Sequence, residues 1–391
     1  MRENEIAFLE SRFRGFSCPQ EGLDEGFLGL VAATYARETT RRFLSRHRAE
    51  LTRRGHRLVG FVEDWLSHEM AFEMVWDPAV GSIFRATQVG NVADAATAAA
   101  ALALRVSASG RSGEWSLVLG KPVRLQWGRW LLPTANQIAV ICNGTAACVR
   151  CRFGDDNREV NFTRTDDDWQ ADDADSMPQF GTQYKKITVL PATASAADSS
   201  GAFEDPLPVA EKLSPEIVRD YQEPITLLAE YSPIYLPWVL RVLRYIIPLR
   251  ETDIRSGSVE DQFGVVCVSL GLNAVALAES FVHEASHQYL HLLCRLGPLD
   301  DGTDANFYYS PVMRMERPLS RIVVAYHAFA NLVLFYRFCV SNGVADEGYC
   351  ARREAELASQ VEQLESPLRT NQALTPIGRG LCDPLIERLQ A

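Results

Sequence analysis

Residues 273–297 read NAVALAESFVHEASHQYLHLLCRLG, and the rest of the chain is best understood outward from this stretch. It contains no glycine or proline before Gly297, a residue type that often ends helices, so it predicts one long helix that begins near Asn273. Within it, residues 283–287 spell an HExxH motif. Residues four apart lie on one helix face, about one turn apart. Both imidazoles can therefore reach the same ion, and the motif predicts a metal centre at His283 and His287.

The same helix carries two further polar residues beside the pair. Glu284 follows His283 directly, so it leans to the side of the metal, where its carboxylate can touch a bound water. His291 lies one more turn along and is too distant to join the same coordination sphere, so we expect it beside the site or at the surface. The alternative interpretation is that these histidines are capped or core residues of an amphipathic helix.

A stable open metal site needs a third protein ligand, and two candidates lie downstream. His327 sits in the apolar stretch RIVVAYHAFANLVLFYRF, where a lone histidine is unexpected unless a metal uses its lone pair. Glu316, in MRMERPL, would instead complete a set of two histidines and one carboxylate, the usual arrangement of non-haem Fe(II). We favour His327 over Glu316. The alternative for His327 is a core histidine hydrogen-bonded to a carbonyl.

Arginines cluster near the same region and offer a site for an anionic ligand. A guanidinium presents a planar fork that matches a carboxylate. Arg317, in the loop that leads into the His327 helix, is the first choice for binding a carboxylate near the metal, and Arg321 is the second. Arg314 and Arg337 belong to the same cluster, and a surface position is the ordinary interpretation for most of the four arginines.

Composition excludes several classes of partner. The 391 residues carry a formal net charge of −11, and an acidic chain repels phosphate backbones, so no nucleic acid partner is expected. We find no apolar run of the roughly 18–20 residues that span a membrane, and no signal-peptide pattern near Met1. The nine cysteines are then expected to be reduced, and the protein cytoplasmic. Cys148 and Cys151 form a lone CxxC with no second pair at zinc spacing, which favours structural or incidental thiols.

Patterning along the chain predicts an α+β protein in three parts. Residues 1–112 read as a helical N-terminal region, and 113–195 as a β-rich region that is a candidate for peptide binding. A small, polar stretch at 192–205 predicts a linker. Residues 206–391 read as a mainly α-helical domain with the metal site, in which we expect an apolar helix at 235–247 and a buried strand at 263–270.

One segment of the N-terminal region is strongly basic. The stretch 37–57 contains eight arginines and only two glutamates. A solvated helix face is the ordinary interpretation. The functional alternative is a docking face for an acidic peptide segment.

Three of these stretches resemble a known family. LAESFVHEASHQYL, SPVMRMERPLSR and HAFANLVLFYRF resemble HExxH-containing peptide-modification proteins, the 2-oxoglutarate-dependent HExxH-type peptide β-hydroxylases. The resemblance covers about residues 210–340. It implies Fe(II) with 2-oxoglutarate and O2 as cosubstrates, and a precursor peptide that is ribosomally synthesised and hydroxylated at a side-chain β-carbon. The residues it carries over are His283, Glu284, His287, Arg317 and His327.

Two other functions stay open at this stage, as does the oligomeric state. In a zinc metallopeptidase, Zn2+ would bind the same histidines and Glu284 would act as general base. HExxH is first of all a pattern of such enzymes, but the segment after His287 lacks the glycine and histidine of the metzincin continuation. The remaining alternative is a peptide-binding protein without catalysis.

Overall fold

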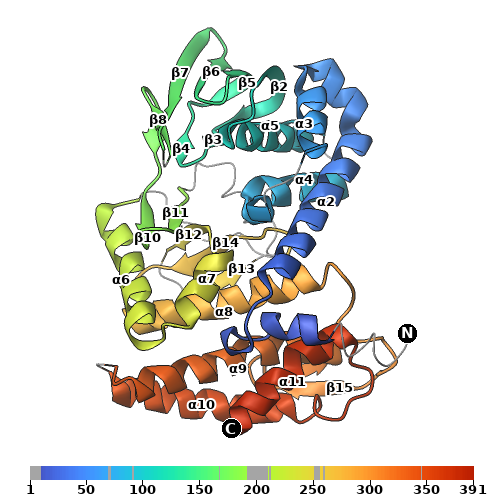
Figure 1. Ribbon diagram of the computed structural model, residues 1–391, viewed down its shortest axis with the longest axis vertical. Coiled ribbons are helices and arrows are strands. Elements are labelled where there is room, and N and C mark those ends of the chain that lie inside the picture. The colour runs from blue at the N-terminus through green and yellow to red at the C-terminus, as the bar shows by residue number, and fades with distance from the viewer. Residues whose placement is uncertain are drawn as a thin grey trace.

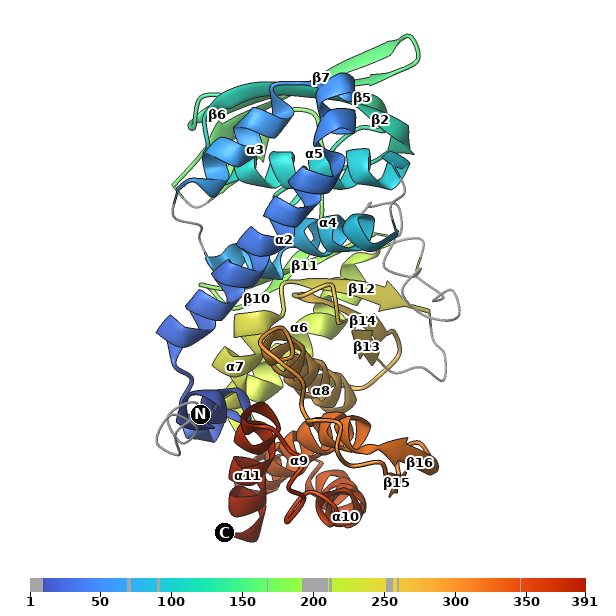
Figure 2. The same ribbon diagram turned by 90° about the vertical axis from the view of Figure 1, so that its right-hand side faces the viewer.

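A computed structural model describes residues 10–68, 72–89, 92–166, 168–191, 210, 213–250, 256–258, 260–344 and 346–391. The predicted linker at 192–205 lies outside these residues. Figures 1 and 2 show an elongated molecule with a sheet and its helices at one end, a second sheet in the middle and a helical layer at the other end. The predicted α+β class is confirmed.

The N-terminal region is helical, as expected. Its elements are η1 (Arg14–Phe16), η2 (Pro19–Glu21), α2 (Glu25–Arg54), α3 (Leu58–Leu66), η3 (Phe72–Trp76), α4 (Pro78–Val89) and α5 (Val92–Ala108). The long helix α2 runs from the middle of the molecule to its upper end (Figure 2). The basic segment 37–57 lies mostly on α2, and five of its arginines form ion pairs with glutamates, namely Arg41, Arg48, Arg53, Arg54 and Arg57. This pairing favours the solvated face over a peptide dock.

The upper sheet is an antiparallel array that packs against α5. Its strand order is β1-β2-β5-β6-β7-β8, with β1 (Gly55–His56), β2 (Gly113–Val123), β5 (Ala135–Cys142), β6 (Ala146–Phe153), β7 (Asp156–Arg164) and β8 (Trp169–Ala171). A small sheet beside it contains β3 (Gln126–Trp127), β4 (Trp130–Leu131) and β9 (Asp175–Ser176). Cys148 and Cys151 lie three apart on β6, so they point to opposite faces and cannot chelate one metal.

The middle sheet positions the site. Its order is β10-β11-β12-β14-β13, with β10 (Gln179–Gly181), β11 (Lys186–Val189), β12 (Tyr245–Leu249), β13 (Ser256–Ser258) and β14 (Val265–Ser269). The strands β11, β12 and β14 are parallel, and every residue of β14 is buried, as expected of a strand covered on both faces. The edge strand β13 is antiparallel to β14.

Two expectations about this region are corrected. The apolar stretch 235–247 is not one helix: α7 (Tyr235–Val242) ends before it, and the β-branched Ile246 and Ile247 pair with β14 inside the sheet. The β-rich region also does not end as a unit at 195, because β10 and β11 join the sheet of the later part. The part with the predicted metal site is therefore built on a five-stranded sheet as well as helices.

Helices and one hairpin complete the molecule. They are α6 (Pro215–Tyr231), α8 (Ala274–Leu293), β15 (Phe307–Ser310), β16 (Met315–Pro318), α9 (Leu319–Ser341), α10 (Glu347–Glu365) and α11 (Pro376–Gln390). Contrary to the expectation that no apolar run is long enough, α9 has the length and hydropathy of a membrane span. Of its apolar window, 72% is buried inside the protein, as in the core helix of a globular fold.

Candidate metal centre

The HExxH motif lies on α8, near the middle of the molecule. The Asn273 side chain caps the helix by accepting a hydrogen bond from the backbone N–H of Ala276 at 2.9 Å. The helix packs against β13 and β14 on one side and α9 on the other. Its apolar and motif residues are therefore buried on most sides, while His283 and His287 are half-buried and line a cavity.

The two motif histidines converge on one point. Their Nε2 atoms lie 3.0 Å apart, and the rings are almost perpendicular, with centroids 4.6 Å apart. At metal–nitrogen distances of about 2.0–2.1 Å, this separation corresponds to an angle of roughly 90–97° at a shared cation. Burial lowers the pKa of His287 well below its ordinary value, and the neighbouring His283, His291 and His327 lower it further. The neutral ring of His287 keeps the lone pair that a metal needs, and the convergence of the two Nε2 atoms fits a divalent cation.

Glu284 lies on the sheet side of the pair. Its side chain is buried, and Oε1 accepts a hydrogen bond of 2.7 Å from Ser256 Oγ on β13. Among the described residues no hydrogen-bond partner meets Oε2. Ser256 itself lines the cavity, so its hydrogen bond connects Glu284 to the cavity wall. The second carboxylate oxygen, Oε2, can still accept a hydrogen bond.

The cavity between α8, β13, the β15–β16 hairpin and α9 has a volume of about 620 Å³. Figure 2 shows α8 and β13 above the hairpin and α9. The α9 wall is apolar and consists of Val324, Ala325, Phe329 and Leu332. Phe329 meets the His283 ring edge-on, with centroids 5.5 Å apart. The volume lies within the range of about 300–1,000 Å³ that is usual for small-molecule sites.

Three arginines line the cavity, and two of them give it a positive charge although the chain as a whole is acidic. Arg317 on β16, Arg321 on α9 and Arg353 on α10 all line it. Arg353 is already neutralised, since it forms ion pairs with Glu279 at 2.8 Å and Glu356 at 3.2 Å. Within the described ranges no ion pair engages Arg317 or Arg321. The structure therefore brings both predicted arginines to the histidine pair with their charge available for an anion.

Glu279 and Arg353 are cavity residues that the sequence did not single out. The Glu279 carboxylate is buried, accepts a hydrogen bond of 2.7 Å from Tyr336 Oη and pairs with Arg353. The sequence does contain an indication of Glu279, because this residue lies four positions before His283 on the same helix face. Arg353 comes from a distant helix, and no local pattern connects it to the motif.

His327, the preferred third ligand, does not line this cavity. It is fully buried on α9, and its Nε2 donates toward the carbonyl oxygens of Ser17, at 2.9 Å, and Phe16, at 3.1 Å. Burial lowers the pKa of His327 to about 4, so the ring is neutral. Nε2 is committed to the backbone of the N-terminal segment and His327 is not among the residues that line the cavity, so the expected ligand role stays a prediction. The structure shows the alternative, a core histidine hydrogen-bonded to carbonyls.

Glu316, the second candidate for third ligand, also faces elsewhere. It lies on β16 directly before Arg317, and successive strand residues point to opposite faces. Arg317 lines the cavity, so the exposed Glu316 points away from it. Among the described residues no group of three histidine, cysteine or acidic side chains is placed to hold a metal. The protein donors seen at this centre are thus the two imidazoles of α8.

His291 lies one helical turn beyond His287 on α8 and does not converge with the two motif histidines. Its ring lies 5.9 Å from that of His287, centroid to centroid, at an interplanar angle of 28°. Burial, together with the charges of Arg295 and Arg321, lowers the pKa of His291 to about 4. It is a neutral, partly buried neighbour of the centre.

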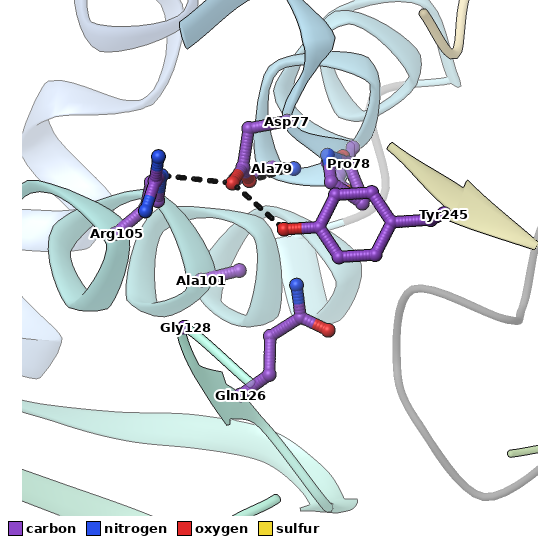
Figure 3. Close-up of a pocket in the computed structure, with 9 residues that line it drawn as sticks. Asp77, Pro78, Ala79, Ala101, Arg105, Gln126, Gly128 and Tyr245 are labelled. Carbon is purple, nitrogen blue, oxygen red and sulfur yellow. Dashed lines mark hydrogen bonds and ion pairs between the residues drawn. The ribbon is translucent and has the colours of Figure 1, made fainter. Parts of the chain in front are cut away.

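A second, much smaller cavity lies where the upper helices meet the middle sheet. Asp77, Arg105 and Tyr245 point toward one another there, from the start of α4, from α5 and from β12 (Figure 3). Asp77 Oδ2 lies 2.9 Å from Arg105 Nε and 3.5 Å from Tyr245 Oη. Burial raises the pKa of Asp77, and Arg105 opposes this shift. With a volume of about 20 Å³ the cavity holds no more than one water molecule. We interpret the cluster as polar contacts between the upper helices and the middle sheet.

Comparison with known proteins adds no identification. No protein-family model matches the chain, and no curated protein matches it. The assignment of the centre therefore depends on its own geometry and on the resemblance of the motif segments.

Proposed function

We propose that this protein is a non-haem Fe(II)/2-oxoglutarate-dependent hydroxylase that acts at the β-carbon of a side chain in a ribosomally synthesised precursor peptide. One observation carries the proposal: a converging pair of imidazoles and two arginines with available charge line the same cavity. A metal-binding pair alone suits many reactions. A metal-binding pair beside two guanidinium groups suits an anionic cosubstrate that binds next to the metal.

The imidazoles of His283 and His287 would hold the iron. The 3.0 Å between their Nε2 atoms would let both rings reach one ion, and imidazole is a ligand that suits iron. With two protein nitrogens seen, other positions remain for 2-oxoglutarate, O2 and a further donor. Bound iron and 2-oxoglutarate supply the oxidising power: a C–H bond becomes C–OH while 2-oxoglutarate and O2 become succinate, CO2 and the hydroxyl oxygen.

The arginines would bind the carboxylates of 2-oxoglutarate. A guanidinium forms two parallel hydrogen bonds to a carboxylate, and such charge-assisted bonds are about twice as strong as neutral ones. Arg317 and Arg321 lie on the hairpin and on the first turn of α9, so they approach the cavity from one side. This arrangement would orient the cosubstrate relative to the histidine pair.

The remaining walls would position the peptide and exclude water. The apolar surface of α9, with Val324, Phe329 and Leu332, offers no group that hydrogen-bonds a stray water. Glu284 keeps one acceptor oxygen in reserve, which would hold a water or a backbone N–H of the substrate. In this function Glu284 positions groups and is not a hydrolytic base.

A zinc metallopeptidase is the second candidate, and the same free oxygen of Glu284 favours it. A general base needs an acceptor beside the metal-bound water, and Glu284 Oε2 would supply one. The arginines weigh against it, because peptide hydrolysis does not need two available cations beside the metal. A peptide-binding protein without catalysis is the third candidate.

The test separates all three. The purified chain is reconstituted anaerobically with Fe(II) and 2-oxoglutarate, O2 is admitted and succinate is measured, with a peptide mixture analysed for a mass gain of one oxygen. A parallel sample with Zn2+ is analysed for peptide cleavage. Succinate release with oxygen incorporation supports the hydroxylase, cleavage with Zn2+ and no succinate supports the peptidase, and neither reaction with retained peptide binding supports the third candidate.

A further inference from the structure

The β15–β16 hairpin carries a concentration of exposed apolar side chains. Of ten large hydrophobic residues that are exposed in the described part of the chain, four lie between 307 and 315. They are Phe307, Tyr309, Met313 and Met315, and the exposed fraction of each residue lies between 48% and 64%. Single exposed hydrophobic residues are normal, but a cluster on one short hairpin indicates a contact surface.

Strand register divides these residues between two faces. Ser310 lies directly opposite Met315, and Tyr308 lies opposite Arg317, and opposite residues of an antiparallel pair share a face. Ser310 and Arg317 line the cavity, so Met315 is on the cavity face of the hairpin. Phe307 and Tyr309 alternate with Tyr308 and Ser310 along β15, which places them on the opposite face.

The turn of the hairpin lies between the hairpin face that points toward the cavity and the wall of the cavity itself. Val312 and Met313 lie in this turn and line the cavity, and 53% of Met313 is also exposed. An apolar surface therefore runs from the α9 wall through Met313 to Met315 outside. We call Val312, Met313 and Met315 the methionine rim.

We propose that the methionine rim binds a large apolar side chain of an extended peptide, next to the residue whose side chain enters the cavity. The inference rests on the proposed function, which makes a peptide the substrate. Continuity with the cavity argues for this occupant, because any residue placed at the histidine pair brings its chain neighbours onto the cavity mouth. In an extended chain, neighbours lie about 3.3 Å apart along the backbone, so the next side chains fall on the rim.

The size and chemistry of the rim support a peptide over a second copy of this chain. A stable dimer buries about 800 Å² on each partner, far more than three side chains provide. Methionine is unbranched and adapts its shape, which suits a site that accepts apolar side chains of different form. The rim is therefore expected to prefer leucine, methionine or phenylalanine at one position without requiring a single residue.

A binding selection without metal tests this inference. A bead-bound library of random decapeptides is incubated with the full chain in the absence of iron, 2-oxoglutarate and O2, and retained peptides are sequenced. We expect enrichment of large apolar residues at one position. The variant Met313→Ser/Met315→Ser should lower this enrichment about tenfold or more, since burial of a methionine side chain is lost. The matched variant Phe307→Ser/Tyr309→Ser, on the opposite face, should retain it.

Equal enrichment by the methionine variant, loss in the Phe307/Tyr309 variant alone, or no enrichment in wild type would overturn the inference. So would a wild-type dimer in sedimentation that the methionine variant converts to monomers. Circular dichroism of each variant confirms folding before selection. Because the selection needs no turnover, apolar enrichment without any hydroxylation overturns only the proposed function, whereas hydroxylation without apolar enrichment overturns only the rim.

Discussion

Ser256 Oγ, on the edge strand β13, donates a hydrogen bond of 2.7 Å to Oε1 of Glu284, on the motif helix α8. This bond joins the middle sheet to the HExxH motif through a residue that itself lines the cavity. It also commits one of the two carboxylate oxygens of Glu284 to the protein. The role of the remaining oxygen is what separates a hydroxylase from a peptidase at this centre.

Replacement of Glu284 by glutamine distinguishes those two reactions. The amide oxygen can still accept the hydrogen bond from Ser256, so the fold around α8 should persist. Loss of a general base typically costs about 10²–10⁴-fold in rate, whereas a positioning group costs less. We expect succinate release by Glu284→Gln to stay within about tenfold of wild type. A loss of more than a hundredfold in peptide cleavage with Zn2+, in a protein that makes no succinate, would contradict the hydroxylase.

Replacement of either motif histidine should remove the metal. With one imidazole gone, only one of the two converging protein nitrogens is left to hold the ion. We expect His283→Ala and His287→Ala each to bind less than about a tenth of the wild-type iron, measured by elemental analysis after anaerobic loading. His56→Ala is the control, because His56 is exposed on the upper sheet. Equal iron content in all four proteins would place the metal elsewhere.

Replacement of the cavity arginines should weaken cosubstrate binding specifically. Lysine keeps the charge of Arg317 or Arg321 but loses the planar fork. We expect Arg317→Lys and Arg321→Lys each to raise the KM for 2-oxoglutarate about 10- to 100-fold, with iron content unchanged. Arg337→Lys is a matched control on α9, since Arg337 pairs with Glu354 outside the cavity. An unchanged KM in both cavity variants would argue against a carboxylate at these arginines.

Replacement of His327 tests whether it is a core residue or a ligand. His327→Ala removes the His327 donor from the carbonyl of Phe16, leaves Ser17 O with its bond from Asn331 Nδ2 alone, and creates a cavity beside α9. We expect a loss of about 2–4 kcal/mol in the free energy of unfolding in urea, and wild-type iron binding by the folded protein. Wild-type stability combined with loss of iron would restore His327 as a ligand.

The buried His327 also predicts a pH dependence of stability. Its pKa is lowered to about 4 in the folded protein, below the ordinary value of 6.5, so between these values the unfolded chain binds the additional proton. The stability contributed by the neutral ring is present above pH 6.5 and is lost as the pH falls toward 4. Between pH 5 and 6, we expect His327→Asn to reduce the slope of unfolding free energy against pH by about 1 kcal/mol per unit. Parallel slopes would contradict the neutral buried ring.

The sequence pattern was sufficient for a correct prediction wherever all the residues concerned lie on one helix or strand. The spacing of His283 and His287 predicts their convergence, because a helix places residues four apart on one face. Short β-rich runs between glycines predict the upper sheet for the same reason. The helix predicted at 235–247 failed, because a run of apolar residues without clear periodicity suits a buried strand as well as a helix, and only pairing with β14 decides between them.

The partners of the motif depended on contacts that no local pattern contains. His327 is a suitable ligand by residue type, but α9 turns it toward the carbonyls of the N-terminal segment. Arg353 reaches Glu279 across 74 positions of sequence, and Ser256 reaches Glu284 from a neighbouring strand. The sequence by itself determined the mixed class of the fold and the two imidazoles, since both follow from periodicity within single elements. Only the tertiary structure decided which arginines, acids and methionines surround those imidazoles, because packing between distant elements selects which side chains share a cavity.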